Sequence, residues 1–150
     1  MIALIQRVTE ASVRVGGRTI AAIGPGMVAL IGVEPADDPA EVERMAARLL
    51  RLRVFEDAEG RMNLDLGATG GDLLLVPQFT LLADTDSGHR PSFGGAAPPE
   101  QARALFDALR ARCLEHGQRT ESGQFGADMQ LALVNDGPAT FILKVRRSRF

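Results

Sequence analysis

Apolar residues in the first part of the chain follow the two-residue period of β-strands. Residues 2–8 begin apolar on both faces and residues 27–33 are almost uniformly apolar, which predicts two buried strands. Residues 11–15 alternate between apolar and polar side chains, which predicts a half-buried strand. Gly16-Gly17 then favours a tight hairpin into a strand at residues 18–23. The pattern therefore predicts four strands, joined in an antiparallel arrangement, before the first helix.

Two segments show the period of amphipathic helices. The first begins at Asp38, a good N-cap, followed by Pro39 at the first helical position and Glu41 at the third, which forms a capping-box pattern. The second helix is expected at about residues 99–116, with Gly117 as its stop. Each helix has one apolar face, made by Val42, Met45, Ala46, Leu49 and Leu50 in the first and by Ala102, Leu105, Phe106, Leu109 and Cys113 in the second.

The rest of the chain predicts short strands and loops. The glycine-rich residues 67–71 lack the Gly-Lys-Ser/Thr ending of a phosphate-binding loop, so they are interpreted as a flexible turn. A polar loop is expected from Asp84 to about Pro98. Further strands are expected at residues 54–55, 62–66, 73–76, 129–134 and 141–145. Together the elements predict a single α+β domain of mainly antiparallel strands and two amphipathic helices at residues 1–145, followed by a basic tail at 146–150.

Composition and charge narrow the functional classes. The apolar fraction of 45% and charged fraction of 24% are typical of a globular domain. The net charge of −2 gives no general attraction for nucleic acid, so any RNA contact has to be local or brief. The lone Cys113 rules out an internal disulfide and suits a reducing compartment. Neither a membrane span nor a signal peptide is evident, so a cytoplasmic location is expected.

The usual catalytic patterns do not occur in this sequence. Two histidines and one cysteine cannot supply an ordinary structural zinc site, and there is no His-Glu-x-x-His or Gly-x-Ser-x-Gly. Cys113 is interpreted as a buried structural thiol, and His116 as a residue that suits the C-terminus of its helix. His89 could contact a ligand, or it could be a solvated loop residue. We expect no metal and no cofactor.

Two segments combine small or hydroxyl residues with unusual backbone chemistry. In Pro77-Gln78-Phe79-Thr80 a buried strand reaches a loop, where exposed N–H groups can stabilise an oxyanion. In Asn135-Asp136-Gly137-Pro138-Ala139-Thr140 the Asp-Gly pair predicts a hairpin turn between the last two strands. The proline disfavours the left-handed angles that such a turn needs at Gly137. On the residues alone, a functional site and a simply packed strand end and hairpin both stay open.

The two segments together resemble the motif pair of the D-aminoacyl-tRNA deacylases, also called D-tyrosyl-tRNA deacylases. Four further segments resemble that family in the same order, at residues 1–8, 57–60, 90–93 and 125–130, so the resemblance covers essentially the whole chain. It implies the family's barrel-like fold and a homodimer that binds tRNA, without DNA or membrane as a partner. It also implies hydrolysis of the ester between a D-amino acid and the terminal adenosine of tRNA, and removal of glycine from mischarged tRNA.

The resemblance assigns the turn to stereochemical selection. Gly137 and Pro138 would be joined by a cis peptide bond and would reach into the active site of the other subunit. Their carbonyl groups would crowd out an L side chain and leave room for a D side chain. The remaining members of this substrate-binding set would be Asn135, Thr140 and Met129.

The resemblance assigns catalysis to Gln78, Phe79 and Thr80. In one view of the family the Thr80 side chain is the catalytic group. In the other, the amides of Phe79 and Thr80 stabilise the oxyanion and the 2′-hydroxyl of tRNA helps to activate water. Because the sequence holds no Ser-His-Asp or metal set, we favour the second view.

This chain departs from the family pattern at two positions. Pro77 stands where the family usually has serine, and proline offers neither a hydroxyl nor a backbone N–H. Ala139 replaces the usual valine, which predicts a change in packing only. The alternative hypothesis is therefore a dimeric tRNA-binding homologue whose catalysis is impaired by Pro77.

Overall fold

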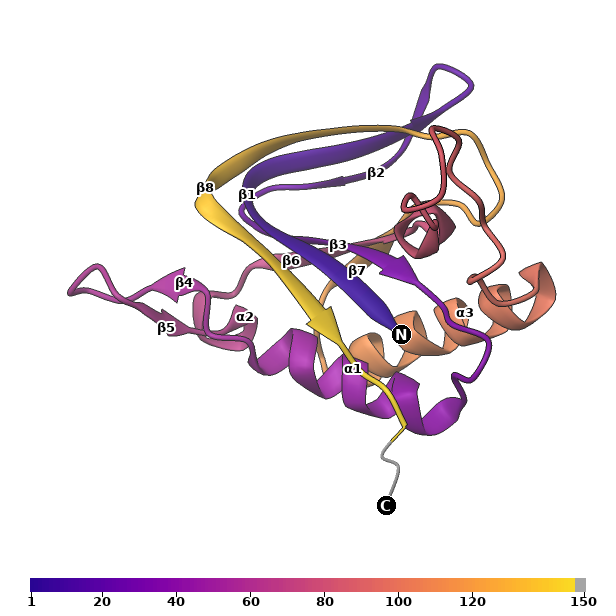
Figure 1. The fold of residues 1–150 in the computed structure, drawn as a ribbon. Coiled ribbons are helices and arrows are strands. Elements are labelled where there is room, and N and C mark those ends of the chain that lie inside the picture. Colours follow the sequence, from indigo (N-terminus) through magenta and orange to yellow (C-terminus); the bar gives the residue numbers. More distant parts are fainter. Residues whose placement is uncertain (148–150) are drawn as a thin grey trace.

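The main feature of the computed structural model, which describes residues 1–147, is one six-stranded sheet that curls into a nearly closed barrel. The strand order is β2-β1-β3-β6-β7, and β8 pairs with the other edge of β1. Figure 1 shows the helices α1 and α3 lying together against one side of this sheet. The strands of the sheet are β1 (Ile2–Val15), β2 (Arg18–Ile23), β3 (Gly26–Gly32), β6 (Asp72–Pro77), β7 (Thr120–Ser122) and β8 (Gln130–Lys144).

The remaining elements lie at the edges of the sheet or on its outer face. A two-stranded hairpin, β4 (Phe55–Glu56) with β5 (Met62–Leu64), projects from the body of the molecule (Figure 1). The helices are α1 (Pro39–Arg51), α2 (Leu66–Thr69), α3 (Pro99–Glu115) and the 3₁₀ helix η1 (Phe79–Leu82). The prediction of a single α+β domain is confirmed.

The sheet has a hydrophobic core on each face. The outer core joins alternate residues of β3 and β6, such as Met27 and Leu73, to the apolar faces of α1 and α3. The inner core fills the barrel with the intervening residues, such as Val28 and Leu74, and with the second half of β1. Alternate side chains of a strand point to opposite faces, so a strand covered on both sides is apolar throughout. This explains why 27–33 and 73–76 could be predicted as buried strands.

The two long helices follow their sequence signals closely. The side chain of Asp38 accepts a hydrogen bond from the amide of Ala40, and the Glu41 carboxylate accepts one from the amide of Asp38, which is the predicted capping box. In α3 the predicted apolar face is buried against the outer core. Cys113 on this face is fully buried, and burial raises the pKa of its thiol to about 12. The prediction that Cys113 is a buried structural thiol is therefore confirmed.

Two strand predictions were wrong in the same way. Residues 2–8 and 11–15 form one continuous strand, β1, so three strands precede α1 and not four. Likewise, the predicted strands 129–134 and 141–145 do not form a hairpin, because residues 130–134 and 141–144 belong to one strand, β8, which runs antiparallel to β1. A strand can continue through polar residues, without a turn, when it stays paired with the same neighbouring strand along one edge. The turn between Gly16 and Gly17 is present, with both glycines in the left-handed region.

The sheet is also less antiparallel than predicted. β3 runs parallel to β6, and β6 runs parallel to β7. Each parallel pair is linked by a crossover that contains a long helix, α1 in the first case and α3 in the second. The two helices thereby come to lie side by side over the same face.

Residues 67–71 are more ordered than the predicted flexible turn. Leu66–Thr69 forms the single helical turn α2, whose N-cap Asp65 accepts a hydrogen bond from the amide of Ala68 at 3.0 Å. Gly70 ends the turn in the left-handed conformation, with φ of 68°.

Of the predicted basic tail, the structure describes Arg146 and Arg147, which pair with Glu34 and Asp38. Residues 148–150 lie outside the described part of the chain.

Candidate functional site

An apolar cleft of about 690 Å³ opens at the end of β6. We call it the β6 cleft. One wall is formed by Pro77, Gln78 and Phe79, where β6 passes into η1, and the other by the residues that precede β8. The first turn of α3 and the loop before it complete the lining. The remaining lining residues include Phe93, Ala96, Ala102, Phe125 and Met129.

The cleft presents main-chain donors at the start of η1. The amide of Gln78 is tied to the carbonyl of Ile31 in β3 at 2.8 Å, which fixes this corner to the sheet. Within residues 1–147, the amides of Phe79 and Thr80 have no main-chain acceptor, as expected for the first residues of a helix. Such free amides at the rim of an apolar cleft can bind an oxyanion.

Thr80 has an exposed hydroxyl held by its neighbour. The side-chain amide of Gln78 donates a hydrogen bond to Thr80 Oγ1. With that lone pair engaged, the hydroxyl proton of Thr80 is directed to another acceptor. Of the three residues predicted as catalytic, Gln78 and Phe79 line the cleft, and Thr80 follows them in η1 and is linked to the cleft through Gln78.

Three phenylalanines give the cleft an aromatic lining. The rings of Phe79 and Phe93 meet edge to face, with centroids 5.2 Å apart. Both rings are unusually exposed, 57% for Phe79 and 41% for Phe93. Phe125 lies on the opposite side and carries the guanidinium of Arg103 over its ring at 5.1 Å. Exposed aromatic faces of this kind are suited to stacking with a nucleic acid base.

Gly123 packs behind two cleft residues, Met129 and Pro77, and the sequence alone did not reveal this contact. A β-carbon at this position would lie 2.8 Å from the sulfur of Met129 and 3.3 Å from the ring of Pro77. A larger residue here would displace the Met129 side chain from its place against the end of β6. No strand was predicted at residues 120–122, where the structure has β7, so nothing in the sequence marked this glycine.

The segment predicted as a hairpin turn is a bulge in β8. Opposite β1, Gln6 pairs with Thr140 and Val8 pairs with Asn135, so the single residue Arg7 faces all of residues 136–139. We call these four residues the Gly-Pro bulge. The peptide bond between Gly137 and Pro138 is cis, as the family resemblance implied.

Arg7 holds the Gly-Pro bulge in place by a hydrogen bond to its main chain. The residue is 5% exposed, and its Nε donates to the carbonyl of Asp136 at 2.8 Å. Its Nη1 donates to the carbonyl of Val54, just before β4, at 2.6 Å. Two main-chain segments distant in sequence are thus fixed by one guanidinium group. No role for Arg7 was predicted, because its partners lie far away in the sequence.

Asn135 closes the neck of the bulge. Its Nδ2 donates to the carbonyl of Arg7 at 2.9 Å and to that of Ala139 at 3.3 Å. At the other side, Gln6 donates to the hydroxyl of Thr140 at 3.2 Å. The tip of the bulge, Gly137 and Pro138, is exposed to solvent. The bulge is therefore a rigidly held main-chain loop that presents its tip outwards.

The two predicted parts of the site do not meet within one chain. None of residues 135–140 lines the β6 cleft, whereas Met129, predicted to belong with them, does line it. In Figure 1 the sharp bend of β8 stands on the side of the β4–β5 hairpin, while η1 lies at the other side of the sheet. Within one copy of the chain the two parts therefore do not form a single cleft.

Comparison with known proteins places these two parts in a family. The sequence matches the family described as "D-Tyr-tRNA(Tyr) deacylase" over residues 4–144. A D-aminoacyl-tRNA deacylase of Azotobacter vinelandii is 59% identical over 144 residues, which cover 96% of this chain and 99% of the relative. This chain belongs to the D-Tyr-tRNA(Tyr) deacylase family. The resemblance first seen in the motifs is confirmed.

Other members of the D-Tyr-tRNA(Tyr) deacylase family and solved structures agree along nearly the full length. A D-aminoacyl-tRNA deacylase of Cronobacter sakazakii is 54% identical over 145 residues, 97% of this chain and all of the relative. The solved structure described as "c-Myc DNA Unwinding Element Binding Protein" has a TM-score of 0.91 and 38% identity, covering 98% of this chain and 100% of that one. A probable eukaryotic D-amino acid tRNA deacylase, at 18% identity and a TM-score of 0.81 over 96% of this chain and 98% of that one, has the same fold.

The structure shows what surrounds Pro77 and Ala139, the two departures from the family pattern. Pro77 pairs with Ile31 at the end of β6 and places its ring in the cleft. Ala139 is buried at the base of the bulge.

In the part of the chain that the structure describes, no helix is long and apolar enough to cross a membrane. No three His, Cys, Asp or Glu side chains among residues 1–147 are grouped to hold a metal ion.

Proposed function

We propose that this chain acts as a D-aminoacyl-tRNA deacylase whose active site combines the β6 cleft of one copy with the Gly-Pro bulge of a second. Family membership supports the reaction, which is hydrolysis of D-aminoacyl-tRNA to free D-amino acid and tRNA in translation proofreading. The observation that carries the shared site is that cleft and bulge are each rigidly built and exposed, but lie apart in one chain.

The outer edge of β8 is the surface that we assign to the second copy. Within the described residues β8 pairs only with β1, so the other edge of this 15-residue strand is open. Val134 and Ile142, on either side of the bulge, are 50% and 62% exposed. A long open edge with exposed apolar residues favours association. Pairing there would carry the tip of each bulge towards the neighbouring copy.

The chemistry needs positioning more than a strong nucleophile. The aromatic lining of the cleft would hold the terminal adenosine, which brings the ester carbonyl to the amides of Phe79 and Thr80. Water adds to that carbonyl, and the two amides stabilise the negative oxygen that forms. The bond to the ribose oxygen then breaks and the ribose oxygen takes a proton. The 2′-hydroxyl next to the ester can assist the proton transfers.

Thr80 serves in this scheme as a positioning donor. Among residues 1–147, no histidine, lysine or carboxylate hydrogen-bonds its hydroxyl, whose partner is Gln78. A threonine hydroxyl without an adjacent base is a weak nucleophile, which disfavours a covalent threonyl ester. Its free proton can instead be donated to the substrate.

Stereochemical selection is assigned to the main chain of the bulge. The carbonyl groups near Gly137 and Pro138 would occupy the space that an L side chain needs, while the opposite side stays open for a D side chain. A main-chain wall rejects one stereochemistry without regard to the identity of the side chain. Glycine has no side chain to reject, so glycyl-tRNA is expected to be a substrate as well. The cytoplasm, where aminoacyl-tRNA is used, is the expected location.

The function is tested by offering the pure protein D-Tyr-tRNA and L-Tyr-tRNA in parallel. We expect hydrolysis of the D-ester to be faster by about a hundredfold or more, since the wrong stereoisomer clashes with a rigid wall. Equal rates for the two esters would contradict the proposed gate. The chain with Pro77→Ser is the matched control for the departure at the cleft. Activity found only in that variant would favour the impaired tRNA-binding homologue.

A further inference from the structure

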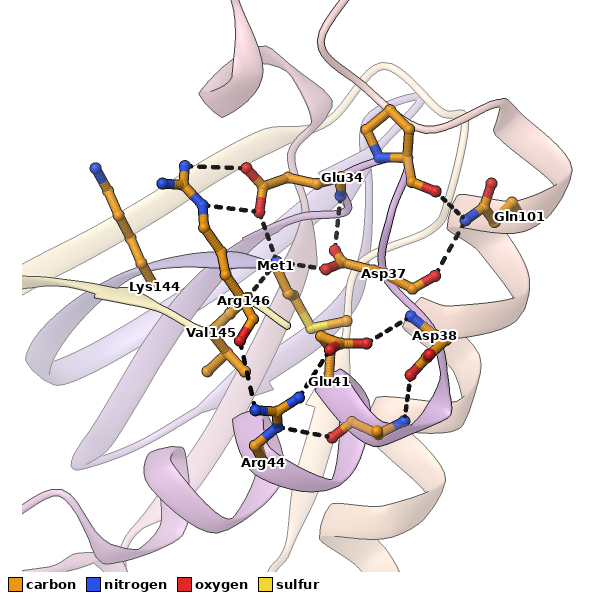
Figure 2. A network of polar contacts seen from close by, with 12 residues as sticks. Met1, Glu34, Asp37, Asp38, Glu41, Arg44, Gln101, Lys144, Val145 and Arg146 are labelled. Atoms are coloured by element: carbon orange, nitrogen blue, oxygen red, sulfur yellow. Dashed lines mark hydrogen bonds and ion pairs between the residues drawn. The ribbon is translucent and has the colours of Figure 1, made fainter. Parts of the chain in front are cut away.

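The amino group of Met1 is buried at the outer end of the sheet. Met1 is 0% exposed, and its ammonium group has three acceptors at short distance. These are Glu34 Oε2 at 2.8 Å, Asp37 Oδ1 at 2.7 Å and the carbonyl of Val145 at 2.7 Å. Figure 2 shows Glu34 and Asp37 of the β3–α1 loop and Val145, just after β8, converging on the ammonium nitrogen. Three donors thus meet three acceptors, and the ammonium group is fully satisfied.

The two carboxylates are held in place by other parts of the fold. Asp37 is 7% exposed, and its second oxygen accepts the amide of Glu34 at 2.7 Å. Gln101 of α3 donates to the carbonyl of Asp37 at 3.2 Å, which ties the loop to the helix layer. Glu34 also pairs with Arg146 at 3.1 Å. The cluster holds two negative and two positive charges, so the ammonium group is one half of its charge balance.

The pKa of the Glu34 carboxyl group depends on the neighbouring charges of this cluster. Burial alone would raise its pKa, but the hydrogen bonds from the Met1 ammonium group and from Arg146 outweigh burial and hold the pKa below its usual value. The main chain adds a second link, because the amide of Val145 donates to the carbonyl of Met1 at 2.9 Å. Met1 and Val145 therefore extend the β1–β8 pairing by a reciprocal pair of bonds.

We propose that the amino group of Met1 is a modification-sensitive site, and that the chain reaches full stability only while this amine is unacylated. A formyl or acetyl group would turn the ammonium into an amide that has one N–H and no charge. It would also require space where three acceptors now lie within 2.8 Å. Glu34 and Asp37 would then face each other with only Arg146 as a counter-charge, and removing one partner of a buried ion pair is costly.

The proposal also names the reaction that would restore the site. Where the chain carries a formyl group on Met1, water must add to the formamide carbon and the C–N bond must break. Formate leaves, and the amine takes up a proton to become the ammonium ion. A hydrolase of the deformylating class would therefore have to act before the cluster can close. Residues added ahead of Met1 would disturb the cluster for the same reason, since their amide has neither the charge nor the three donors.

The sequence offers a built-in control for chemical labelling. Lys144 is the single lysine of the sequence and is exposed, in contrast to the buried amine of Met1. An N-hydroxysuccinimide ester of acetate at neutral pH should add one acetyl group to the native protein, at Lys144. Native Lys144→Arg should take up none, and the same variant unfolded in urea should take up one that hydroxylamine does not remove, at Met1. Labelling of Met1 in native Lys144→Arg as fast as in urea would overturn the proposal.

Stability is the second readout. Lys144→Arg is acetylated on Met1 in urea, treated with hydroxylamine to restore the Cys113 thiol, and refolded beside a mock-treated sample. We expect the acetylated protein to melt about 10 °C lower, or to fail to refold while the mock sample succeeds. Asp37→Asn with a free amine should lower the Tm similarly but add little to the acetylated protein, because both changes remove the same interaction. An equal Tm for acetylated and mock samples would overturn the proposal.

Discussion

Gly137→Ala is expected to reduce hydrolysis of D-aminoacyl-tRNA by about a hundredfold while leaving the protein folded. A β-carbon at this position would lie 2.5 Å from Oδ1 of Asn135 and 3.2 Å from the amide nitrogen of Ala139. The Asn135 side chain can move away, but its Nδ2 would then release the carbonyls of Arg7 and Ala139. The neck of the bulge would open and its tip would shift by part of an ångström or more.

The damage from this substitution should stay local. The bulge is exposed and contributes little to either hydrophobic core, so the Tm should change by only a few degrees. The rate with D-Tyr-tRNA and the ratio of D to L hydrolysis are both measured, because the ratio reports the gate and not the fold. Gly24→Ala is the matched control, since a β-carbon there meets no atom within 4 Å. Unchanged rate and ratio in Gly137→Ala would remove the bulge from the active site.

Replacing Arg7 by lysine is expected to have an effect of similar size, about a hundredfold on the rate, together with a lower D to L ratio. A single ammonium group cannot reproduce the fork by which Arg7 reaches the carbonyls of Asp136 and Val54. One buried carbonyl would lose its donor, and the bulge would no longer be fixed to the segment before β4. Because Arg7 touches no cleft residue in its hydrogen bonds, we regard it as a positioning residue.

The D to L ratio separates positioning from a loss of fold. A variant that is merely unstable would lose both activities in proportion to the unfolded fraction. A loosened bulge would instead admit L side chains and lower the ratio in the folded protein. Arg14→Lys is the control on the same strand, where the guanidinium is exposed and bonds only to the nearby turn at Gly17. A normal ratio in Arg7→Lys, with stability lost, would assign Arg7 to folding alone.

The sequence predicted well those features that depend on neighbouring residues. The capping box of α1, the apolar faces of α1 and α3 and the strands buried on both faces all arise from patterns within one segment. The Gly-Pro bulge was predicted as a hairpin because an Asp-Gly pair between two apolar runs has the same local signal in both structures. Only the pairing of both runs with β1 distinguishes them, and that pairing is a property of the whole sheet.

The site could be predicted in its parts but not in its arrangement. Gln78, Phe79 and Thr80 were identified by resemblance; Gln78 and Phe79 line the β6 cleft, and Thr80 is bonded to Gln78 beside it. The anchoring role of Arg7 depends on contacts with Asp136 and Val54, which are separated from it by more of the chain than any local pattern spans. The catalytic role of Gln78, Phe79 and Thr80 and the gating role of the Gly-Pro bulge depend on a substrate and a second copy of the chain. These roles, and the effect of Pro77, stay predictions.

We propose that each active site takes its cleft from one copy and its gate from another. Mixing two inactive variants tests this shared site most directly. Phe79→Pro removes a proposed oxyanion donor, at a first helical position where proline is compatible with the fold. Gly137→Ala disables the gate. Each variant alone should be nearly inactive with D-Tyr-tRNA.

After the two variants are unfolded together in equal amounts and refolded, half of the dimers should contain one copy of each. In such a dimer one site combines two damaged parts and the other combines an intact cleft with an intact gate. We therefore predict recovery of about a quarter of the activity of the unmodified protein, since half of the dimers regain one of two sites. A mixture no more active than its separate components would contradict the shared site.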